Sequence, residues 1–232
     1  MAPNDHVLDE LALAGPEHRD PAYVAAYDRK AAFDPAGELA ELRELGLDST
    51  ATLVDLGAGT GTFALAAARV CARVVAVDVS PAMVSAMRER AAEAGLAKVE
   101  VVQAGFLSYR HAGPPADFVY TRNALHHVPD FWKALALERI AGFLRPGGVL
   151  RLRDLVYACE PQEAAEVVSA WLEDAVERPE AGWTRAEREQ HVREEFSTFS
   201  WLLEPMLQRA GFDIERAEFR ARIYADYVCR RR

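Results

Sequence analysis

The chain has 232 residues, of which 50% are hydrophobic, and a formal net charge of −9 at pH 7. This length supports one sizeable core rather than two generous domains, and the spread of acidic residues along the chain argues against a nucleic-acid partner. The N-terminal segment lacks the basic start and apolar core of a signal peptide, and no apolar run approaches the ~18 residues of a membrane span, so we expect a cytoplasmic protein.

Helical segments are expected before the main fold begins. Residues 1–20 are polar with scattered proline, which predicts a loose leader or lid. Apolar residues from Tyr23 to Phe33 recur at helical spacing until Asp34-Pro35 stops the pattern, and leucines between Leu39 and Leu47 continue on a second helix. Residues 1–49 are therefore predicted to form a helical lid.

From residue 50 the sequence alternates between strands and helices. Short apolar runs that predict strands cover 52–56, 73–77, 99–103, 117–121 and 148–155. Helical segments lie between them at 61–70, 80–95 and 130–143. Ser80 and Pro81 mark one helix start clearly, because serine supplies the N-cap oxygen and proline fits the first turn. The alternation predicts an α/β fold, a Rossmann-like, doubly wound sheet of mostly parallel strands.

The alternation stops after residue 156, and the chain closes differently. Helices are expected at 161–178 and 184–196, the second with a capping box, and a further helix is expected at 200–211, kinked or started at its proline. Two strands then follow at 212–220 and 223–230, and their very short connection permits only antiparallel pairing. The predicted division is a helical lid at 1–49, a core at 50–156, a helical insertion over the substrate pocket at 157–199 and closing elements at 200–232.

A glycine-rich turn follows the first strand. Gly57, Gly59 and Gly61 alternate with single residues, and Asp55 stands two residues before the first of them. Glycine is needed where the backbone takes positive φ or lets a ligand approach closely. A dinucleotide fingerprint would place its third glycine one residue later. The alternative is a tight strand-to-helix turn that binds nothing.

The pattern acid-x-Gly-x-Gly-x-Gly resembles motif I of the class I S-adenosylmethionine-dependent methyltransferases. The segment Leu125-His126-His127 and the turn Pro146-Gly147-Gly148 resemble the type-11 methyltransferase group, and the expected antiparallel hairpin is also how this family's sheet ends. The resemblance implies S-adenosylmethionine as cofactor, S-adenosylhomocysteine as product, and methyl transfer to an O, N or C nucleophile of a small molecule.

The resemblance also assigns cofactor contacts to the carboxyl ends of the strands. The glycine loop would hold the carboxypropyl end, Asp78 would accept hydrogen bonds from the ribose, and Val79 and Met83 would flank the adenine. Many relatives carry an acidic residue where this chain has Gly105, so backbone groups and packing are expected to hold the adenine here. The predicted set is Asp55, Gly57, Ala58, Gly59, Gly61, Asp78, Val79, Met83, Gly105, Phe106 and Asn123. For Asp78 the alternative is a second cap for the helix that begins at Ser80.

Candidate catalytic residues are His126, His127, Asp154 and Tyr27. Either histidine could serve as a general base, and the alternative is that the pair shapes the cofactor shelf. Asp154 closes the fifth strand at the same edge of the sheet, and Tyr27 could act electrostatically on the cationic donor together with Asp55.

Three residues from the regions outside the sheet, Tyr23, His191 and Trp201, are the candidates for substrate contact. On the fifth strand, Arg151 and Arg153 either form structural ion pairs with acidic helix residues or set the charge near the pocket.

We expect no metal, because adjacent histidines point in different directions and the three cysteines have no metal-like spacing. The expected partner is a small-molecule substrate, with neither nucleic acid nor membrane, and the expected assembly is a monomer or homodimer. Two other classes stay open. A nicotinamide-dependent oxidoreductase would share Asp78 but should carry G-x-G-x-x-G, and a non-catalytic protein could bind S-adenosylmethionine without turnover.

Overall fold

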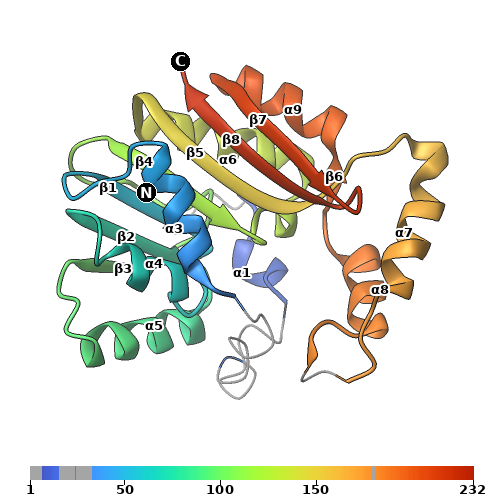
Figure 1. Ribbon diagram of the computed structural model, residues 1–232, viewed down its shortest axis with the longest axis horizontal. Coiled ribbons are helices and arrows are strands. Elements are labelled where there is room, and N and C mark those ends of the chain that lie inside the picture. Colours follow the sequence, from blue (N-terminus) through green and yellow to red (C-terminus); the bar gives the residue numbers. More distant parts are fainter. Residues whose placement is uncertain (1–6, 16–23, 25–32, 179–180) are drawn as a thin grey trace.

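The computed structural model describes residues 7–15, 24, 33–178 and 181–232, and an eight-stranded sheet forms its centre (Figure 1). The strands are β1 (Thr52–Leu56), β2 (Arg73–Asp78), β3 (Val99–Gln103), β4 (Ala116–Arg122), β5 (Leu144–Tyr157), β6 (Thr198–Phe199), β7 (Phe212–Arg220) and β8 (Tyr224–Arg231). Their order is β3-β2-β1-β4-β5-β8-β7, with the short β6 paired to β5. Neighbours among β1–β5 pair in parallel, and β8 is antiparallel to both β5 and β7. The predicted doubly wound sheet with an antiparallel closing hairpin is confirmed.

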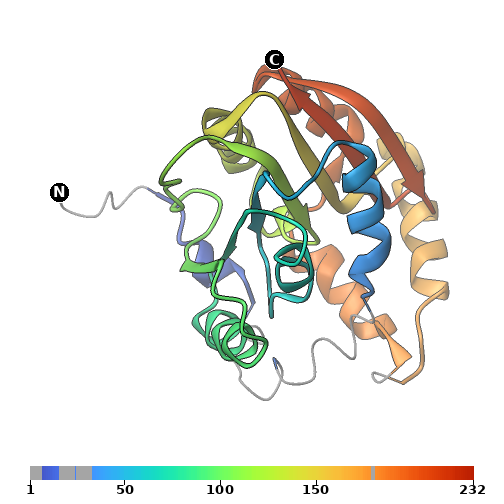
Figure 2. The same ribbon diagram turned by 60° about the vertical axis from the view of Figure 1, so that its left-hand side comes forward.

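Helices cover both faces of the sheet (Figure 1 and Figure 2). The α-helices of the described residues are α1 (Glu10–Leu13), α3 (Pro35–Glu44), α4 (Thr62–Ala67), α5 (Pro81–Glu93), α6 (Asp130–Phe143), α7 (Ala164–Glu173), α8 (Arg185–Glu194) and α9 (Ser200–Arg209). Of these, α7 and α8 lie beyond the end of the sheet rather than on one of its faces. Leu53 of β1 packs into the core shared with α3, α4 and α5, whereas Val54 packs into the core shared with α6 and α9. Burial on both faces explains why the parallel strands read as continuous apolar runs.

Local sequence signals set the helix starts. Ser80 Oγ accepts a hydrogen bond from the Met83 N–H at 3.2 Å, as its N-cap position predicts. Thr184 and Glu187 form the predicted capping box at the start of α8. Asp34 caps α3 by accepting from the Ala36 N–H at 3.0 Å, so Asp34-Pro35 begins a helix. The helix predicted between Tyr23 and Phe33 lies almost entirely outside the described residues.

Several predicted boundaries were wrong for local reasons. The helix expected at 61–70 is α4, Thr62–Ala67, because Gly61 is its left-handed N-cap, with φ +84°. The helix expected at 161–178 is a 3₁₀ turn, Pro161–Glu163, followed by α7, which ends at Glu173. Pro205 lies inside α9 and does not start it. Strand β5 starts at Leu144, so the Pro-Gly-Gly turn falls within its first residues.

The insertion is anchored to the end of the closing hairpin. Val167 and Trp171 of α7 pack with Cys159 and Ile223 in a separate small core. Trp171 Nε1 donates to the Tyr224 hydroxyl at 2.8 Å. All three cysteines of the chain are buried free thiols. Within the described residues, no helix combines the length and apolar character needed to cross a bilayer.

Candidate active site

The glycine turn is held by backbone conformation and by close packing. Gly57, Gly59 and Gly61 have φ of +72°, +57° and +84°, a region that side chains with a Cβ disfavour. A Cβ on Gly57 would lie 2.3 Å from the Cβ of Ala124. The N–H groups of Gly57 and Ala58 both donate to the Val77 carbonyl, at 2.9 and 3.0 Å. The turn therefore ties the end of β1 to β2 and brings it against the loop after β4.

Asp78 at the end of β2 binds two backbone amides. Its Oδ2 accepts from the Gly59 N–H at 2.8 Å, and its Oδ1 accepts from the Ser80 N–H at 2.9 Å. Burial raises the pKa of Asp78 to about 6. Each carboxylate oxygen has a further acceptor site, so the capping role and ribose binding are compatible in one residue.

A narrow cavity of about 80 Å³ lies beside this turn. Its lining includes seven of the predicted cofactor residues, which are Gly57, Gly59, Asp78, Val79, Met83, Phe106 and Asn123. His127 also lines it, as expected for a residue that shapes the cofactor shelf.

Glu10 of α1 lines the same cavity, and it was not predicted from the sequence. Its carboxylate accepts from the N–H groups of Leu107 at 3.1 Å and Ser108 at 3.2 Å. A Cβ on Gly105 would lie 2.3 Å from Glu10 Oε1, so Glu10 occupies the space beside that glycine. Burial raises the pKa of the Glu10 carboxyl. The only sequence feature that pointed to this contact was Gly105, which stands where many relatives carry an acidic residue. It did not indicate that Glu10, almost a hundred residues earlier, occupies the space beside it.

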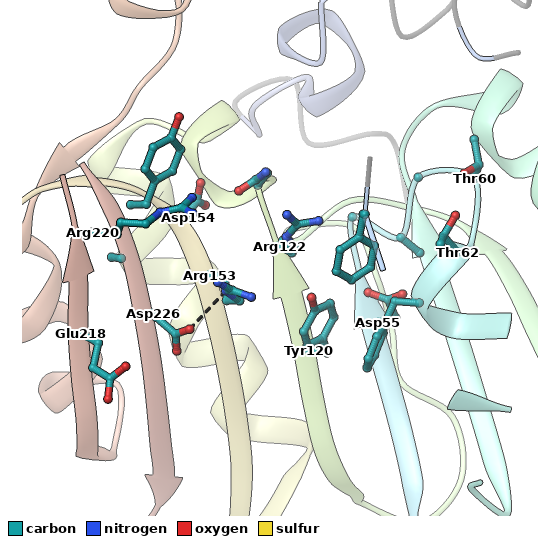
Figure 3. A pocket seen from close by; sticks show the side chains of 18 of the residues that line it. Asp55, Thr60, Thr62, Tyr120, Arg122, Arg153, Asp154, Glu218, Arg220 and Asp226 are labelled. Carbon is teal, nitrogen blue, oxygen red and sulfur yellow. Dashed lines mark ion pairs between the residues drawn. The ribbon is translucent and has the colours of Figure 1, made fainter. Parts of the chain in front are cut away.

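A larger cavity of about 430 Å³ opens on the other side of the glycine turn (Figure 3). Gly57, Gly59 and Asn123 line both cavities, so the two adjoin at these residues. Asn123 takes a left-handed conformation, φ +49°, and its N–H donates to the Arg153 carbonyl at 2.8 Å. Phe33 and Trp183, from the two regions predicted to be lids, also line this cavity.

Asp55 is a buried carboxylate in the wall of the larger cavity. Among the described residues, its Oδ2 has no hydrogen-bond partner. Burial, reinforced by the nearby charge of Asp78, raises the pKa of Asp55 well above its usual range. A buried carboxylate oxygen without a hydrogen-bond partner is suited to bind a cationic group of a ligand. Such a cation would lower the pKa of Asp55 and favour its charged form.

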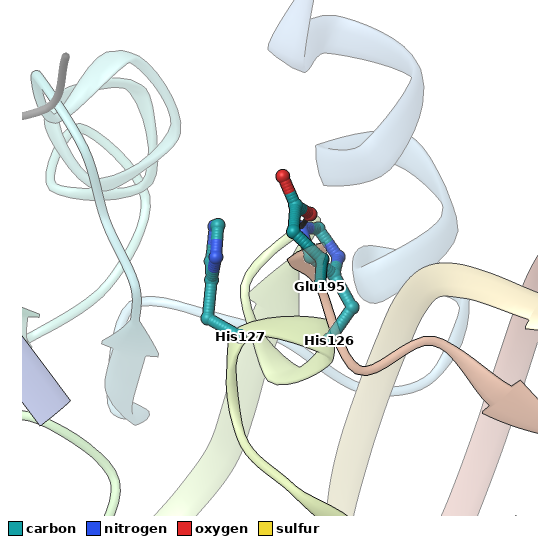
Figure 4. Close-up of side chains that lie close together, drawn as sticks. All are labelled: His126, His127 and Glu195. Atoms are coloured by element: carbon teal, nitrogen blue, oxygen red, sulfur yellow. Dashed lines mark ion pairs between the residues drawn. The ribbon is translucent and has the colours of Figure 1, made fainter. Parts of the chain in front are cut away.

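His126 lies between two carboxylates, of which Figure 4 shows Glu195. It does not line either cavity. Its Nδ1 pairs with Asp154, and its Nε2 lies 3.0 Å from Glu195 Oε2. Burial alone would lower the pKa of His126, but the two carboxylates outweigh it and raise the pKa well above its usual range. Burial is likewise outweighed at Asp154 and Glu195, whose pKa values the imidazolium lowers. The raised pKa favours the imidazolium form of His126, which has no free nitrogen lone pair to accept a proton.

Glu195 also connects the insertion to this network. Its Oε2 lies 2.5 Å from His191 Nδ1, and His191 Nε2 is 2.8 Å from Ser197 Oγ. His126, His127 and Glu195 each offer one atom that could ligate a metal, and these three atoms lie within 4.8 Å of one another. The fold therefore brings Glu195, which is distant in the sequence, next to the two adjacent histidines. Because two imidazoles already share the Glu195 oxygen, we interpret the cluster as an ion-pair network.

The residues predicted to contact the substrate, together with Tyr27, either lie away from both cavities or fall outside the described residues. His191 is buried in the network, and Trp201 is 45% exposed and stacks on Phe199, and neither lines either cavity. Tyr23 and Tyr27 lie outside the described residues. Arg122 and Arg220 line the larger cavity, and neither was predicted from the sequence.

Both arginines of β5 form ion pairs. Arg151 is fully buried, and its Nη2 lies 2.6 Å from Glu41 Oε2. Arg153 pairs with Glu38, and its Nε lies 3.2 Å from Asp226 Oδ2. Arg153 also lines the larger cavity, so both interpretations of this pair hold for it.

Comparison with known proteins identifies the central segment. Residues 53–148 match the family described as methyltransferase domain. This segment, which is less than half of the chain, is therefore similar to a methyltransferase domain. The chain is 37% identical over 114 residues to a trans-aconitate 2-methyltransferase of Azoarcus and 36% identical over 121 residues to that of Methylobacterium radiotolerans. These matches cover 48% and 51% of this chain but only 42% and 43% of the relatives.

Solved methyltransferase structures share the fold over nearly the whole chain. One from Aquifex aeolicus has a TM-score of 0.64 at 20% identity and covers 92% of this chain and 99% of its own. Magnesium protoporphyrin IX methyltransferase from Synechocystis, solved with S-adenosylmethionine bound, has a TM-score of 0.65 at 14% identity and covers 98% and 100%. The described elements of this chain beyond residues 53–148 are therefore part of the shared fold.

Proposed function

We propose that this protein transfers a methyl group from S-adenosylmethionine to an O, N or C nucleophile of a small molecule. The observation that carries the proposal is the junction at Gly57, Gly59 and Asn123, which joins the cofactor-type cavity to a second cavity of about 430 Å³. A volume of this size is typical of small-molecule sites. Donor and acceptor would meet at that junction.

The residues present fit the cofactor. When bound, S-adenosylmethionine supplies an electrophilic methyl group on a sulfonium. Asp55 would face the cationic methionine part from the larger cavity, and Asp78 would accept from the ribose hydroxyls. Val79 and Phe106 would flank the adenine, with Glu10 at the edge of the ring. In this arrangement the orphaned Oδ2 of Asp55 gains a charged partner.

The pair formed by His126 and Asp154 supports the loop beside the junction rather than exchanging protons with the reactants. The raised pKa of His126 favours its imidazolium form, and Asp154 is paired with it. We assign both as positioning residues that fix the loop from Asn123 to His127 against β5. Orientation of a bound nucleophile toward the donor is the main contribution that such a site makes to the rate.

The relatives favour a small acceptor. Trans-aconitate is a small molecule by the name of the two matched enzymes, although other relatives are named for ribosomal protein L11 or for ubiquinone biosynthesis. A pocket of about 430 Å³ that Phe33 and Trp183 help to line suits a small molecule better than a protein surface. We place the enzyme in the cytoplasm, as a monomer or homodimer.

Calorimetry with S-adenosylmethionine, S-adenosylhomocysteine and NAD tests the cofactor. We expect the first two to bind and NAD to give no heat, whereas binding of NAD alone would overturn the proposal in favour of an oxidoreductase. Conversion of S-adenosylmethionine to S-adenosylhomocysteine with a pool of small acceptors separates an enzyme from a non-catalytic binder.

A further inference from the structure

Four charged residues form one row across the floor of the larger cavity (Figure 3). Arg122 of β4 pairs in register with Arg153 of β5, Arg153 pairs with Asp226 of β8, and Asp226 pairs with Glu218 of β7. Residues in register on adjacent strands project from the same face of the sheet. The row therefore places two cations at the end nearest Asn123 and two anions at the far end.

The charges in this row are not equally compensated. Arg153 is neutralised by Glu38 and Asp226. Arg122 instead stacks over Phe33, with its Cζ 4.0 Å from the ring centroid, and no carboxylate of the described residues lies within ion-pair distance of it. Its guanidinium faces the cavity beside Asn123, next to the junction with the cofactor side.

Arg220 repeats this arrangement at the rim. Its Cζ lies 4.8 Å from the ring centroid of Tyr224, its neighbour in register, and it too has no ion pair within the described part of the chain. Counting partners among the described residues alone, two guanidiniums supported only by aromatic rings thus line one cavity of a protein whose net charge is −9. Aromatic stacking holds an arginine while leaving its planar N–H fork available for a carboxylate.

The other acidic groups of this cavity do not cancel these cations. Asp154 is paired with His126, Asp226 is paired with Arg153, and burial raises the pKa of Asp55. Glu218 lies at the far end of the row, 3.9 Å from Arg216. The end of the cavity next to the junction is therefore the cationic one.

Resting on the methyl transfer proposed above, we propose that the acceptor is a small molecule with at least two carboxylates. Arg122 binds the carboxylate that is methylated, and Arg220 with Tyr224 binds a second anionic group at the rim. A carboxylate oxygen forms the new O–CH₃ bond as the C–S bond breaks and its electron pair goes to sulfur. No proton is released, which matches a site whose buried histidine favours the imidazolium form. The product is a methyl ester.

Calorimetry without turnover tests this assignment. The probes are succinate, tricarballylate and the trimethyl ester of tricarballylate, each added with S-adenosylhomocysteine present. We expect the two acids to bind and the ester to give no heat. In Arg122→Gln and in Arg220→Gln, tricarballylate should bind about tenfold or more weakly, because each variant loses a charged hydrogen-bonding pair. Arg185→Gln, on the exposed side of α8 where Arg185 pairs with Glu189, should bind like the wild type.

Separate outcomes distinguish this inference from the function beneath it. The carboxylate assignment is overturned if S-adenosylhomocysteine binds but the wild type binds neither acid. It is also overturned if Arg122→Gln and Arg220→Gln both bind tricarballylate as tightly as the wild type does. If the wild type does not bind S-adenosylhomocysteine, the proposed function itself is overturned. Thermal unfolding of each variant checks its fold, and since Arg220 is exposed, Arg220→Gln remains informative if Arg122→Gln is unstable.

Discussion

The narrower cavity is walled by backbone and by residues close together in sequence, whereas the larger cavity is walled by side chains that four strands bring into one row. Six of the thirteen residues that line the first wall lie between Gly57 and Met83, where turns and caps fix their positions. The second wall needs β4, β5, β7 and β8 in register, and these lie far apart in the chain. The wall of the narrower cavity therefore depends mainly on turns and caps that neighbouring residues form. The wall of the larger cavity forms only when β4, β5, β7 and β8 have paired.

The largest expected effect tests the local wall. Gly59→Val should weaken S-adenosylmethionine binding by about a hundredfold or more, because a branched side chain disfavours φ of +57° and would crowd the N–H that binds Asp78. Gly46→Val is the matched control, since Gly46 also has positive φ, +101°, but a Cβ added there would meet no atoms within 4 Å. Both variants should lose about 1–2 kcal/mol of stability, and calorimetry should show lost binding only for Gly59→Val. Unchanged affinity in Gly59→Val would mean that the turn is only structural.

The next effect concerns the ion-pair network of Asp154, His126 and Glu195, in which Asp154 also lines the larger cavity. Glu195→Gln should lower the free energy of unfolding at pH 7 by about 2 kcal/mol, because a charged partner of buried His126 is lost. The raised pKa of His126 contributes stability that is complete below its ordinary value of 6.5 and declines as the pH rises toward the folded value. The lowered pKa of Glu195 contributes stability above its ordinary value of 4.5 that is lost on acidification.

Urea unfolding from pH 4 to 9 checks this pH profile. The wild type should lose stability above pH 6.5, and Glu195→Gln should show a shallower decline, because the variant raises the pKa of His126 less. The exposed Glu194→Gln serves as control. Identical profiles for the wild type and Glu195→Gln would show that Glu195 does not hold the proton on His126.

The contrast between the two walls also explains which parts could be predicted. The strands of the sheet and the place of Asp78 at the end of β2 followed from local signals, namely apolar runs, glycines and the cap at Ser80. Arg122 could not be recognised, because its value depends on which charges lie in register with it, and Asp226 is more than a hundred residues away. His191 was expected at the substrate, but the fold pairs it with Glu195.

A smaller effect concerns the charge beside the junction. Asp55→Asn should weaken S-adenosylmethionine binding about tenfold and S-adenosylhomocysteine binding much less, since only the former carries the sulfonium charge. Because burial raises the pKa of Asp55, binding of the cation to the wild type should release a proton, so affinity rises with pH. Calorimetry in buffers of different ionisation enthalpy measures that release, which Asp55→Asn should abolish. Equal losses for both ligands would remove Asp55 from the electrostatics of the donor.

The smallest expected effect lies where a distant residue enters the local wall. Glu10→Gln should weaken S-adenosylmethionine binding only a few-fold, about 1 kcal/mol. The amide oxygen of the glutamine can still accept the hydrogen bond from the Leu107 N–H, but its NH₂ group would face the Ser108 N–H and cannot accept from it. Glu10→Ala should cost more, since both amides then lose their acceptor. Asp9→Asn, whose side chain only caps α1, is the control on the same segment. If Glu10→Ala binds the cofactor as the wild type does, α1 is not part of the cofactor wall, and that wall is specified entirely by residues 55–128.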